Sequence, residues 1–409
     1  MRIAILRRAP KTSVSMDVYA DGLISGLKSV RPDWTISEYH PAIKFSSPDE
    51  FRWFDGVKKY QEQYWRYPSK LSHIEADVFH IIDHSDGYLS RWLRRTERLN
   101  VVTCHDLINL AQPDVFKGCA RFPWMSMALW KWAVEGMNQA DRVVTVSAYT
   151  KQDAIKYLGI SAQDITVIPN AVDKAFRPLP PDQIQSIRRR YQLSIETFCL
   201  FNIGSSNPRK NILTILAVVA ELKKQEVPIH FFKAGVDFNS AQKQFIHSHD
   251  LTSHVSYVGQ VDQTTLIELY NAADCLLAPS VYEGFGFTIL EAMASGTPVI
   301  TANVTAMPEV AGDAAILVDP LNVEEITQAV RSLYTHPGER QSLVGKGLER
   351  SSQFTWQSTA EQVARVYEQV YEQARSPTTS FSFKSANQSS LGDRCKQQPS
   401  AQEIYGVKK

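Results

Sequence analysis

The sequence predicts an α/β fold with two doubly wound domains that face each other across a cleft. Short apolar runs alternate with helical stretches, a pattern typical of parallel strands joined by crossover helices. A proline-rich segment at residues 176–181 separates these runs into two series. With 409 residues, the chain is long enough for two or three domains that each have a core. We therefore predict one domain at residues 1–173 and a second at residues 174–355.

Eleven apolar runs are the predicted strands. In the first domain they lie at residues 3–6, 78–82, 101–104, 142–146 and 165–168. In the second domain they lie at residues 198–203, 229–233, 254–258, 275–278, 298–301 and 315–318. The longest apolar run, residues 212–220, is predicted to be a buried helix, because a membrane span needs about 20 residues.

Bulk composition excludes several classes of protein. A net charge of +1 gives no support for nucleic-acid binding. The apolar core of the N-terminus, residues 3–6, is too short for a signal peptide. The five cysteines are scattered and form no Cys-x-x-Cys pair, which indicates a reduced, cytoplasmic protein without a zinc site.

The most informative stretch is residues 280–291, which lies between a predicted strand and a predicted helix at residues 288–295. Its glycines, Gly284 and Gly286, leave backbone N–H groups near a helix start, where an anion binds well. Glu283 lies in this loop and Glu291 lies about one turn into the helix. Two carboxylates beside an anion site suit a ligand that carries hydroxyls as well as an anionic group. A nucleotide sugar has both hydroxyls and phosphates.

The spacing of Glu283 and Glu291 resembles the Glu-x7-Glu motif of the retaining GT4-type glycosyltransferases, which have the GT-B fold of two Rossmann-like domains. Residues 294–300, 308–312 and 317–320 are similar to the rest of that family's donor-binding domain. The resemblance implies transfer of a hexose-like sugar, with retention of configuration, from a nucleoside diphosphate to a hydroxyl. The acceptor would be a glycan, a lipid-linked or a small molecule, in polysaccharide or glycoconjugate biosynthesis. It also implies that a last helix, residues 356–374, crosses back onto the first domain.

The resemblance implies a role for each residue of the loop. Glu291 would accept hydrogen bonds from the ribose hydroxyls, and Glu283 would hold the hydroxyls of the donor sugar. The backbone amides of the loop would stabilise charge on the departing diphosphate. The donor-binding loop residues are Gly284, Phe285, Gly286 and Phe287.

A second donor-binding element is predicted at residues 204–211, after the first strand of the second domain. Gly204 permits a tight turn, while Arg209 and Lys210 place two positive charges near a helix start. These cations could be an ordinary solvated pair, but at this junction they favour a clamp for a diphosphate. The Gly-Lys-Ser/Thr ending of a Walker loop is missing.

The sequence contains no Asp-x-Asp pair that would hold a metal ion on the diphosphate. Arg209, Lys210 and the loop amides could neutralise the leaving group instead. We therefore predict metal-independent chemistry with no cofactor other than the nucleotide-sugar co-substrate.

Polar side chains follow the predicted strands of the first domain, where ligands of doubly wound sheets gather. His105 follows the strand at residues 101–104, and the resemblance implies that it lies beside the reacting carbon. His84 and Asp106 are further candidates for the cleft, although Asp106 could simply cap the next turn. Asn170, before the linker, and Asp17, in a first loop that lacks the family's usual glycines, complete the candidates.

Two aromatic, basic stretches at residues 51–67 and 122–132 leave alternatives open. They could be amphipathic helices with aromatic residues packed inward, an acceptor platform, or a face that docks peripherally on the inner membrane surface. Residues 376–409 are rich in polar residues with little periodicity and are predicted to be disordered. The oligomeric state is left open.

Two other kinds of function share this architecture. A nucleotide-sugar epimerase or a phosphorylase would be an enzyme of the same fold, and release of nucleoside diphosphate only on addition of an acceptor would exclude both. A non-catalytic nucleotide-sugar-binding scaffold would bind the donor without turnover.

Overall fold

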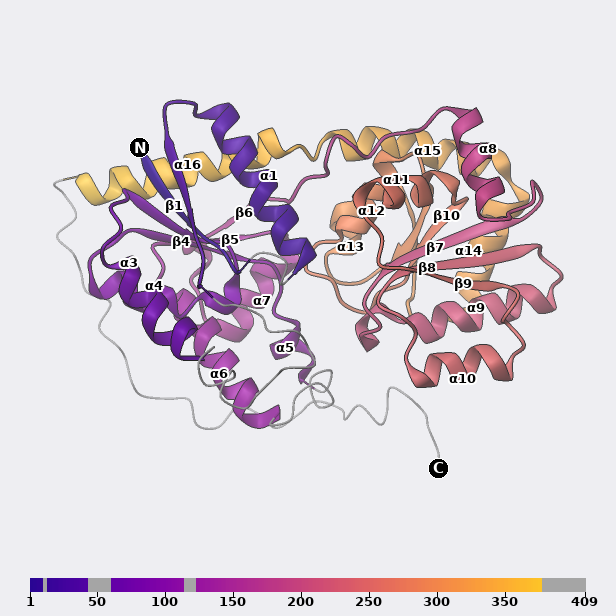
Figure 1. The fold of residues 1–409 in the computed structure, drawn as a ribbon, viewed down its shortest axis with the longest axis horizontal. Coiled ribbons are helices and arrows are strands. Elements are labelled where there is room, and N and C mark those ends of the chain that lie inside the picture. The colour runs from indigo at the N-terminus through magenta and orange to yellow at the C-terminus, as the bar shows by residue number, and fades with distance from the viewer. Residues whose placement is uncertain (10–12, 43–59, 114–122, 377–409) are drawn as a thin grey trace. The chain divides into compact units, whose positions relative to one another are not determined.

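The computed structural model describes residues 1–9, 13–42, 60–113 and 123–376 (Figure 1). Residues 1–371 form one compact unit, and a second unit begins at Glu372. The predicted disordered tail therefore lies almost entirely outside the described residues.

The first half of the chain forms a parallel sheet of six strands in the order β2-β1-β3-β4-β5-β6. Its strands are β1 (Arg2–Leu6), β2 (Thr35–Tyr39), β3 (Val78–Ile81), β4 (Asn100–Cys104), β5 (Arg142–Thr145) and β6 (Ile165–Val167). Its helices are α1 (Val14–Val30), α3 (Tyr67–Leu71), α4 (Leu89–Arg95), α5 (Ile108–Ala111), α6 (Pro123–Glu135) and α7 (Ala148–Leu158).

The second half forms another parallel sheet, in the order β12-β11-β10-β7-β8-β9. Its strands are β7 (Phe198–Gly204), β8 (Ile229–Gly235), β9 (Val255–Gly259), β10 (Cys275–Ala278), β11 (Val299–Ala302) and β12 (Ile316–Val318). Its helices are α8 (Pro181–Arg190), α9 (Ile212–Lys224), α10 (Ser240–Ser248), α11 (Gln263–Ala272), α12 (Phe287–Ala294), α13 (Met307–Ala311), α14 (Val323–Thr335) and α15 (Pro337–Ser352).

Both sheets are buried on two faces, which confirms the predicted doubly wound fold. In β1, Ile3 and Ile5 pack under one layer of helices, while Ala4 and Leu6 pack under the other. Every predicted strand is present within two residues of its predicted ends. The sequence analysis missed β2, an edge strand with no fully buried side chain, because its residues form no apolar run.

The last helix, α16 (Trp356–Arg375), packs on the first sheet although it follows the second in the sequence. Tyr367 contacts His80 of β3 through a hydrogen bond of 2.6 Å between its hydroxyl and Nδ1. The ring of Trp356 occupies the space where a Cβ at Gly22 would lie, so α1 approaches α16 closely at that glycine.

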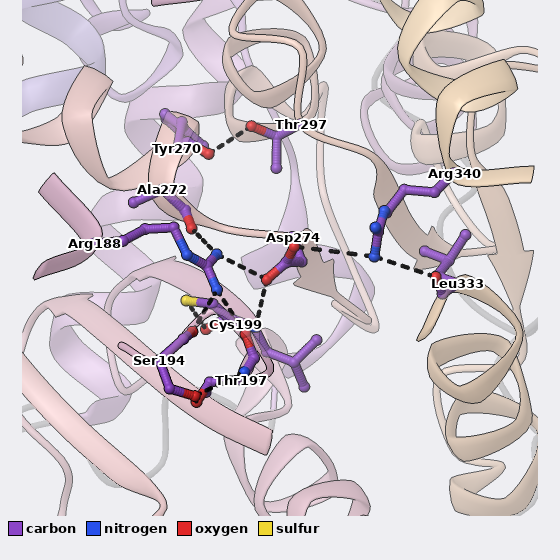
Figure 2. A network of polar contacts seen from close by, with 11 residues as sticks. Arg188, Ser194, Thr197, Cys199, Tyr270, Ala272, Asp274, Thr297, Leu333 and Arg340 are labelled. Atoms are coloured by element: carbon purple, nitrogen blue, oxygen red, sulfur yellow. Dashed lines mark hydrogen bonds and ion pairs between the residues drawn. The ribbon is translucent and has the colours of Figure 1, made fainter. Parts of the chain in front are cut away.

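Helix α8 follows the proline-rich linker and is fixed to the second sheet by Arg188 (Figure 2). The Arg188 guanidinium donates to the carbonyl oxygens of Ala272 at 2.8 Å and Thr197 at 2.6 Å, and pairs with Asp274 at 2.9 Å. Asp274 in turn accepts from the backbone N–H of Cys199 at 2.8 Å. This network joins the linker helix to the amino ends of β7 and β10.

Candidate active site

Glu283 lies between Arg209 and Lys210. Arg209 and Lys210 belong to a 3-10 turn after β7, and Glu283 lies in the loop after β10, the strand that pairs with β7. One carboxylate oxygen of Glu283 is 2.6 Å from Arg209 Nη1, and the other is 2.7 Å from Lys210 Nζ. The two elements predicted to bind the donor therefore meet at one carboxylate.

The charges of this cluster depend on one another. Burial alone would raise the pKa of Glu283, but the charges of Arg209 and Lys210 hold it at about 2. Burial lowers the pKa of Lys210, whereas the charge of Glu283 raises the pKa of Arg209. Two cations face one anion, so the cluster has an excess of positive charge that suits a diphosphate.

Backbone contacts hold the two loops of the cluster together. The N–H of Val281 donates to the carbonyl oxygen of Arg209 at 2.8 Å. Asn211, at a positive φ of 57°, donates from its side chain to the carbonyl oxygens of Pro279 and Pro320 at 3.1 and 2.5 Å. Gly204, with a φ of 145°, lies against the Lys210 side chain. These contacts fix the backbone of the turns that carry the two cations, and Arg209 Nη1 also donates to the carbonyl oxygen of Tyr282 at 3.2 Å.

Glu291 lies in helix α12, on the wall of a cavity of about 830 Å³ that also has Asp173, Val261 and Phe287 in its lining. The hydroxyl of Tyr270 donates to the Glu291 carboxylate at 2.8 Å. Burial raises the pKa of Glu291 to about 7, against the opposing effect of Tyr270 and Lys210. The predicted ribose acceptor is therefore only partly ionised at neutral pH before a ligand binds.

His105 follows β4, and its ring is fixed in a single tautomer. The Nε2 atom lies 2.8 Å from the carbonyl oxygen of Ile82, which can only accept, so Nε2 carries the proton and Nδ1 is left as an acceptor. The ring packs edge-on against Tyr19, with 4.7 Å between centroids. Burial lowers the pKa of His105 to about 4, so its ring is neutral at pH 7.

Gly284 brings the donor loop against His105. A Cβ at Gly284 would lie 1.8 Å from the carbonyl oxygen of His105, so only glycine fits. The carbonyl oxygen of Gly284 accepts from the hydroxyls of Ser147 and Thr150, at 2.8 and 3.1 Å. Next to it, the hydroxyl of Tyr282 donates to Asp153 at 2.5 Å. Helix α7 of the first sheet thus anchors the loop that carries Glu283.

The other predicted loop residues have different surroundings. Gly286 has a φ of 119° and caps α12, whereas the Phe285 side chain is buried against Phe287 and Phe354. Phe285 can therefore reach a ligand only through its backbone. Phe287 lines the cavity beside Glu291.

The remaining candidates are not all close to the cluster. The ring of His84 lies 6.5 Å from that of His105, and Asp106 caps its own turn by accepting from the N–H of Ile108. Asn170 is buried, and its Oδ1 has no partner among the described residues. Asp17 is paired with Arg7 at 2.8 Å and does not line the cavity.

Sequence reasoning missed Tyr270 and Lys233. In the sequence, Tyr270 looks like an ordinary buried residue of a helix, here α11. Its hydroxyl reaches the carboxylate of Glu291 only in the folded chain. Lys233 is completely buried in β8 and donates to the carbonyl oxygens of Gly204 and Val236. A lysine within the apolar run of a central strand was the signal that could have identified it.

The two aromatic stretches are described in part. Trp53, Phe54 and Phe122 lie outside the described residues. Tyr64, Tyr88 and Trp132 pack on one another, and Arg91 lies 5.4 Å from the Trp132 ring centroid. Within the described part of the chain, no helix has the length and apolarity needed to cross a membrane.

Comparison with known proteins places this geometry in context. Two family models match the chain, "Glycosyl transferases group 1" at residues 183–368 and "Glycosyltransferase Family 4" at residues 36–176. The O-antigen chain mannosyltransferase B of Escherichia coli is 29% identical over 309 residues, which cover 73% of this chain and 78% of that protein. The serotype-specific mannosyltransferase WbdA of Escherichia coli is 27% identical over 302 residues. These residues cover 71% of this chain but only 36% of WbdA.

Among solved structures, HepE of Anabaena in complex with UDP-glucose is similar, with a TM-score of 0.70 and 18% identity. The match covers 90% of this chain and 100% of HepE. This similarity confirms the predicted GT-B fold.

Proposed function

The chain belongs to the GT4-type glycosyltransferases, and on that premise we propose that it moves a hexose from a nucleoside diphosphate to an acceptor hydroxyl, with retention and without a metal ion. The observation that carries this proposal is the position of Glu283, which is bound by Arg209 and Lys210 and adjoins His105 through Gly284.

Arg209 and Lys210 bind the diphosphate of the donor. Each cation is paired with a single carboxylate oxygen, and phosphate oxygens can replace that oxygen as the partner. As the bond between the sugar and the diphosphate breaks, negative charge grows on the phosphate oxygen. Cations held in a buried site stabilise that charge more strongly than water would.

Glu283 then becomes available to the donor sugar. Its carboxylate, which is ionised in its pairs with Arg209 and Lys210, then accepts hydrogen bonds from the sugar hydroxyls. Glu291, with Tyr270 behind it, accepts from the ribose hydroxyls at the cavity wall.

Retention follows a front-face path in this proposal. The acceptor oxygen forms its bond to the anomeric carbon on the face from which the diphosphate departs, and the leaving phosphate oxygen takes the acceptor proton. Neutral His105 lies beside that carbon and offers Nδ1 as a hydrogen-bond acceptor. None of these side chains has to form a covalent intermediate, in contrast to the double displacement of retaining glycosidases.

The choice of a hexose rests on the relatives. Two of them are named mannosyltransferases, and HepE is solved with UDP-glucose. Mannose and glucose donors are therefore the first to test.

The test is turnover followed by NMR of the product. Full-length protein is incubated with nucleoside diphosphate mannose and glucose donors and an acceptor panel, and both released nucleotide and the new anomeric signal are recorded. We expect acceptor-dependent release, retained configuration and full activity in EDTA. Inverted configuration, or activity that EDTA abolishes and manganese restores, would refute the corresponding part of the proposal.

A further inference from the structure

Thr305 has a backbone conformation that threonine rarely adopts. Its φ is 56°, in the left-handed region, where a β-branched side chain crowds the backbone. Six described residues other than glycine have a positive φ, and Thr305 is the β-branched one among them. Strain of this kind persists where the surrounding structure enforces it, and it gathers at functional sites. The contacts of Thr305 therefore indicate what the strain supports.

The other left-handed residues have ordinary explanations. Four of them lie two residues after the end of a helix, where a chain commonly turns through this conformation. They are Glu97 after α4, Gln192 after α8, Glu226 after α9 and Asp250 after α10. The fifth, Asn211, follows the turn of Arg209 and Lys210, and asparagine tolerates this region well. Thr305 instead lies between a strand and a helix, in the connection at residues 303–306 from β11 to α13.

This connection binds both polar groups of the Glu283 backbone. The N–H of Glu283 donates to the hydroxyl oxygen of Thr305 at 3.1 Å, and its carbonyl oxygen accepts from the N–H of Ala306 at 3.4 Å. The Glu283 carboxylate pairs with Arg209 and Lys210 on the opposite strand-end turn. Glu283 is therefore fixed twice, at its backbone by the connection and at its carboxylate by the two cations.

The hydroxyl is what glycine at position 305 would lack. Glycine adopts a positive φ without crowding, so the threonine side chain brings no benefit to the turn itself. In the described part of the chain that side chain makes one hydrogen bond, the one to Glu283. Ala306 and Met307, which follow directly and begin α13, are buried and hinder relaxation of the turn.

We propose that Thr305 is a positioning residue, whose hydroxyl holds Glu283 where the carboxylate can bind the hydroxyls of the donor sugar. The inference rests on the proposed function, in which Glu283 has that role. The left-handed turn directs the Thr305 hydroxyl at the donor loop. Arg209 and Lys210 lie on a different turn, so loss of the hydroxyl should affect binding of the sugar more than binding of the diphosphate.

The experiment compares Thr305→Gly, which removes the hydroxyl and relieves the strain, with Thr305→Ser, which keeps the hydroxyl. Calorimetric titration of the full-length chain with UDP, GDP, UDP-glucose and GDP-mannose gives the ratio of affinities for sugar conjugate and nucleoside diphosphate. We expect Thr305→Gly to lower this ratio about tenfold and kcat about tenfold. Its Tm should change little, because relief of strain offsets the added freedom of the unfolded chain. Thr305→Ser should restore both the ratio and kcat.

Glu226→Gly is the matched control. It also replaces a left-handed residue, with a φ of 57°, and the Glu226 side chain is exposed at the end of α9. The Tm of this variant should change as little as that of Thr305→Gly. Its ratio of affinities should equal that of wild type, because no contact to the donor loop is lost.

Three results would overturn the inference. They are an unchanged ratio of affinities in Thr305→Gly, an equal loss in Thr305→Ser, and a fall in the Tm of Thr305→Gly with equal losses of affinity for the diphosphate and its sugar conjugate. The proposed function fails separately. A wild type whose ratio of affinities depends on the Thr305 hydroxyl, but which transfers sugar to no acceptor, would refute the function and leave the role of Thr305 standing.

Discussion

Strand β10 has an arginine–carboxylate cluster at each end, and the two clusters differ in what their cations can still do. Asp274 precedes the strand and binds Arg188, while Glu283 follows it and binds Arg209 and Lys210. The side chains are similarly shielded, with Arg188 17% and Arg209 26% exposed. Burial and residue type alone therefore do not distinguish a structural pair from a functional one.

The difference lies in unused hydrogen-bonding capacity. Arg188 donates to several backbone carbonyls as well as to Asp274, so exchanging its partner would leave buried carbonyl groups unpaired (Figure 2). Lys210 makes one side-chain bond among the described residues, to Glu283, and an ammonium group has three N–H donors. The first cluster therefore stabilises the fold, whereas the second is the one that we propose binds the diphosphate of the donor.

The largest effect is expected from Arg209→Ala. It should cost about 3 kcal/mol of transition-state stabilisation, roughly a hundredfold in kcat/KM. Tm should change little, because Glu283 keeps Lys210 as its partner. Steady-state kinetics and thermal unfolding of the same preparation measure both, and near-normal turnover would remove Arg209 from the clamp.

The reverse pattern is expected from Asp274→Ala. It leaves Arg188 and the N–H of Cys199 without their carboxylate, which should lower the free energy of unfolding by about 2 kcal/mol, since the pair is partly exposed. Affinity for nucleoside diphosphate should not change. Urea unfolding measures the loss, with Asp313→Ala as a control, because the Asp313 side chain pairs with Lys346 while 83% exposed. A stability equal to that of the control would contradict the structural role of Asp274.

A smaller effect is expected from Tyr270→Phe. Loss of the hydrogen bond to Glu291 should weaken nucleoside diphosphate binding by about 1 kcal/mol, because the carboxylate loses the donor that favours its ionised form. Tyr367→Phe, which removes the buried hydrogen bond to His80, is the matched control and should bind normally. Calorimetric titration at pH 7 compares the three proteins, and equal losses would show that the effect is not local to Glu291.

The smallest effect is a pH dependence of several-fold. The pKa of Glu291 is about 7 in the folded protein, so its accepting, ionised form becomes more populated as the pH rises from 6 to 8. Affinity for nucleoside diphosphate should rise over this range in wild type and stay flat in Glu291→Gln. The raised pKa also means that the folded state binds an extra proton between about pH 4.5 and 7, so the contribution of Glu291 to stability falls as the pH rises through that window. If the affinity of Glu291→Gln for nucleoside diphosphate rises with pH as much as that of wild type, the pH dependence belongs to the ligand and not to Glu291.

The sequence predicted the strands well because buried parallel strands are apolar runs, and it predicted that Glu283, Arg209 and Lys210 lie at strand ends. It could not predict that they contact one another. Residues 209 and 283 meet only because β7 and β10 are neighbours in the sheet. The spacing of apolar residues within a strand does not predict which strands pair with one another.

The most direct test of the two-cluster account is a thermal-shift measurement with UDP, GDP and ADP on wild type, Arg209→Ala and Asp274→Ala. The account predicts that one nucleoside diphosphate raises the Tm of wild type and of Asp274→Ala by the same increment. The Tm of Arg209→Ala should hardly change. An equal increment in Arg209→Ala, or none in any of the three proteins, would contradict it.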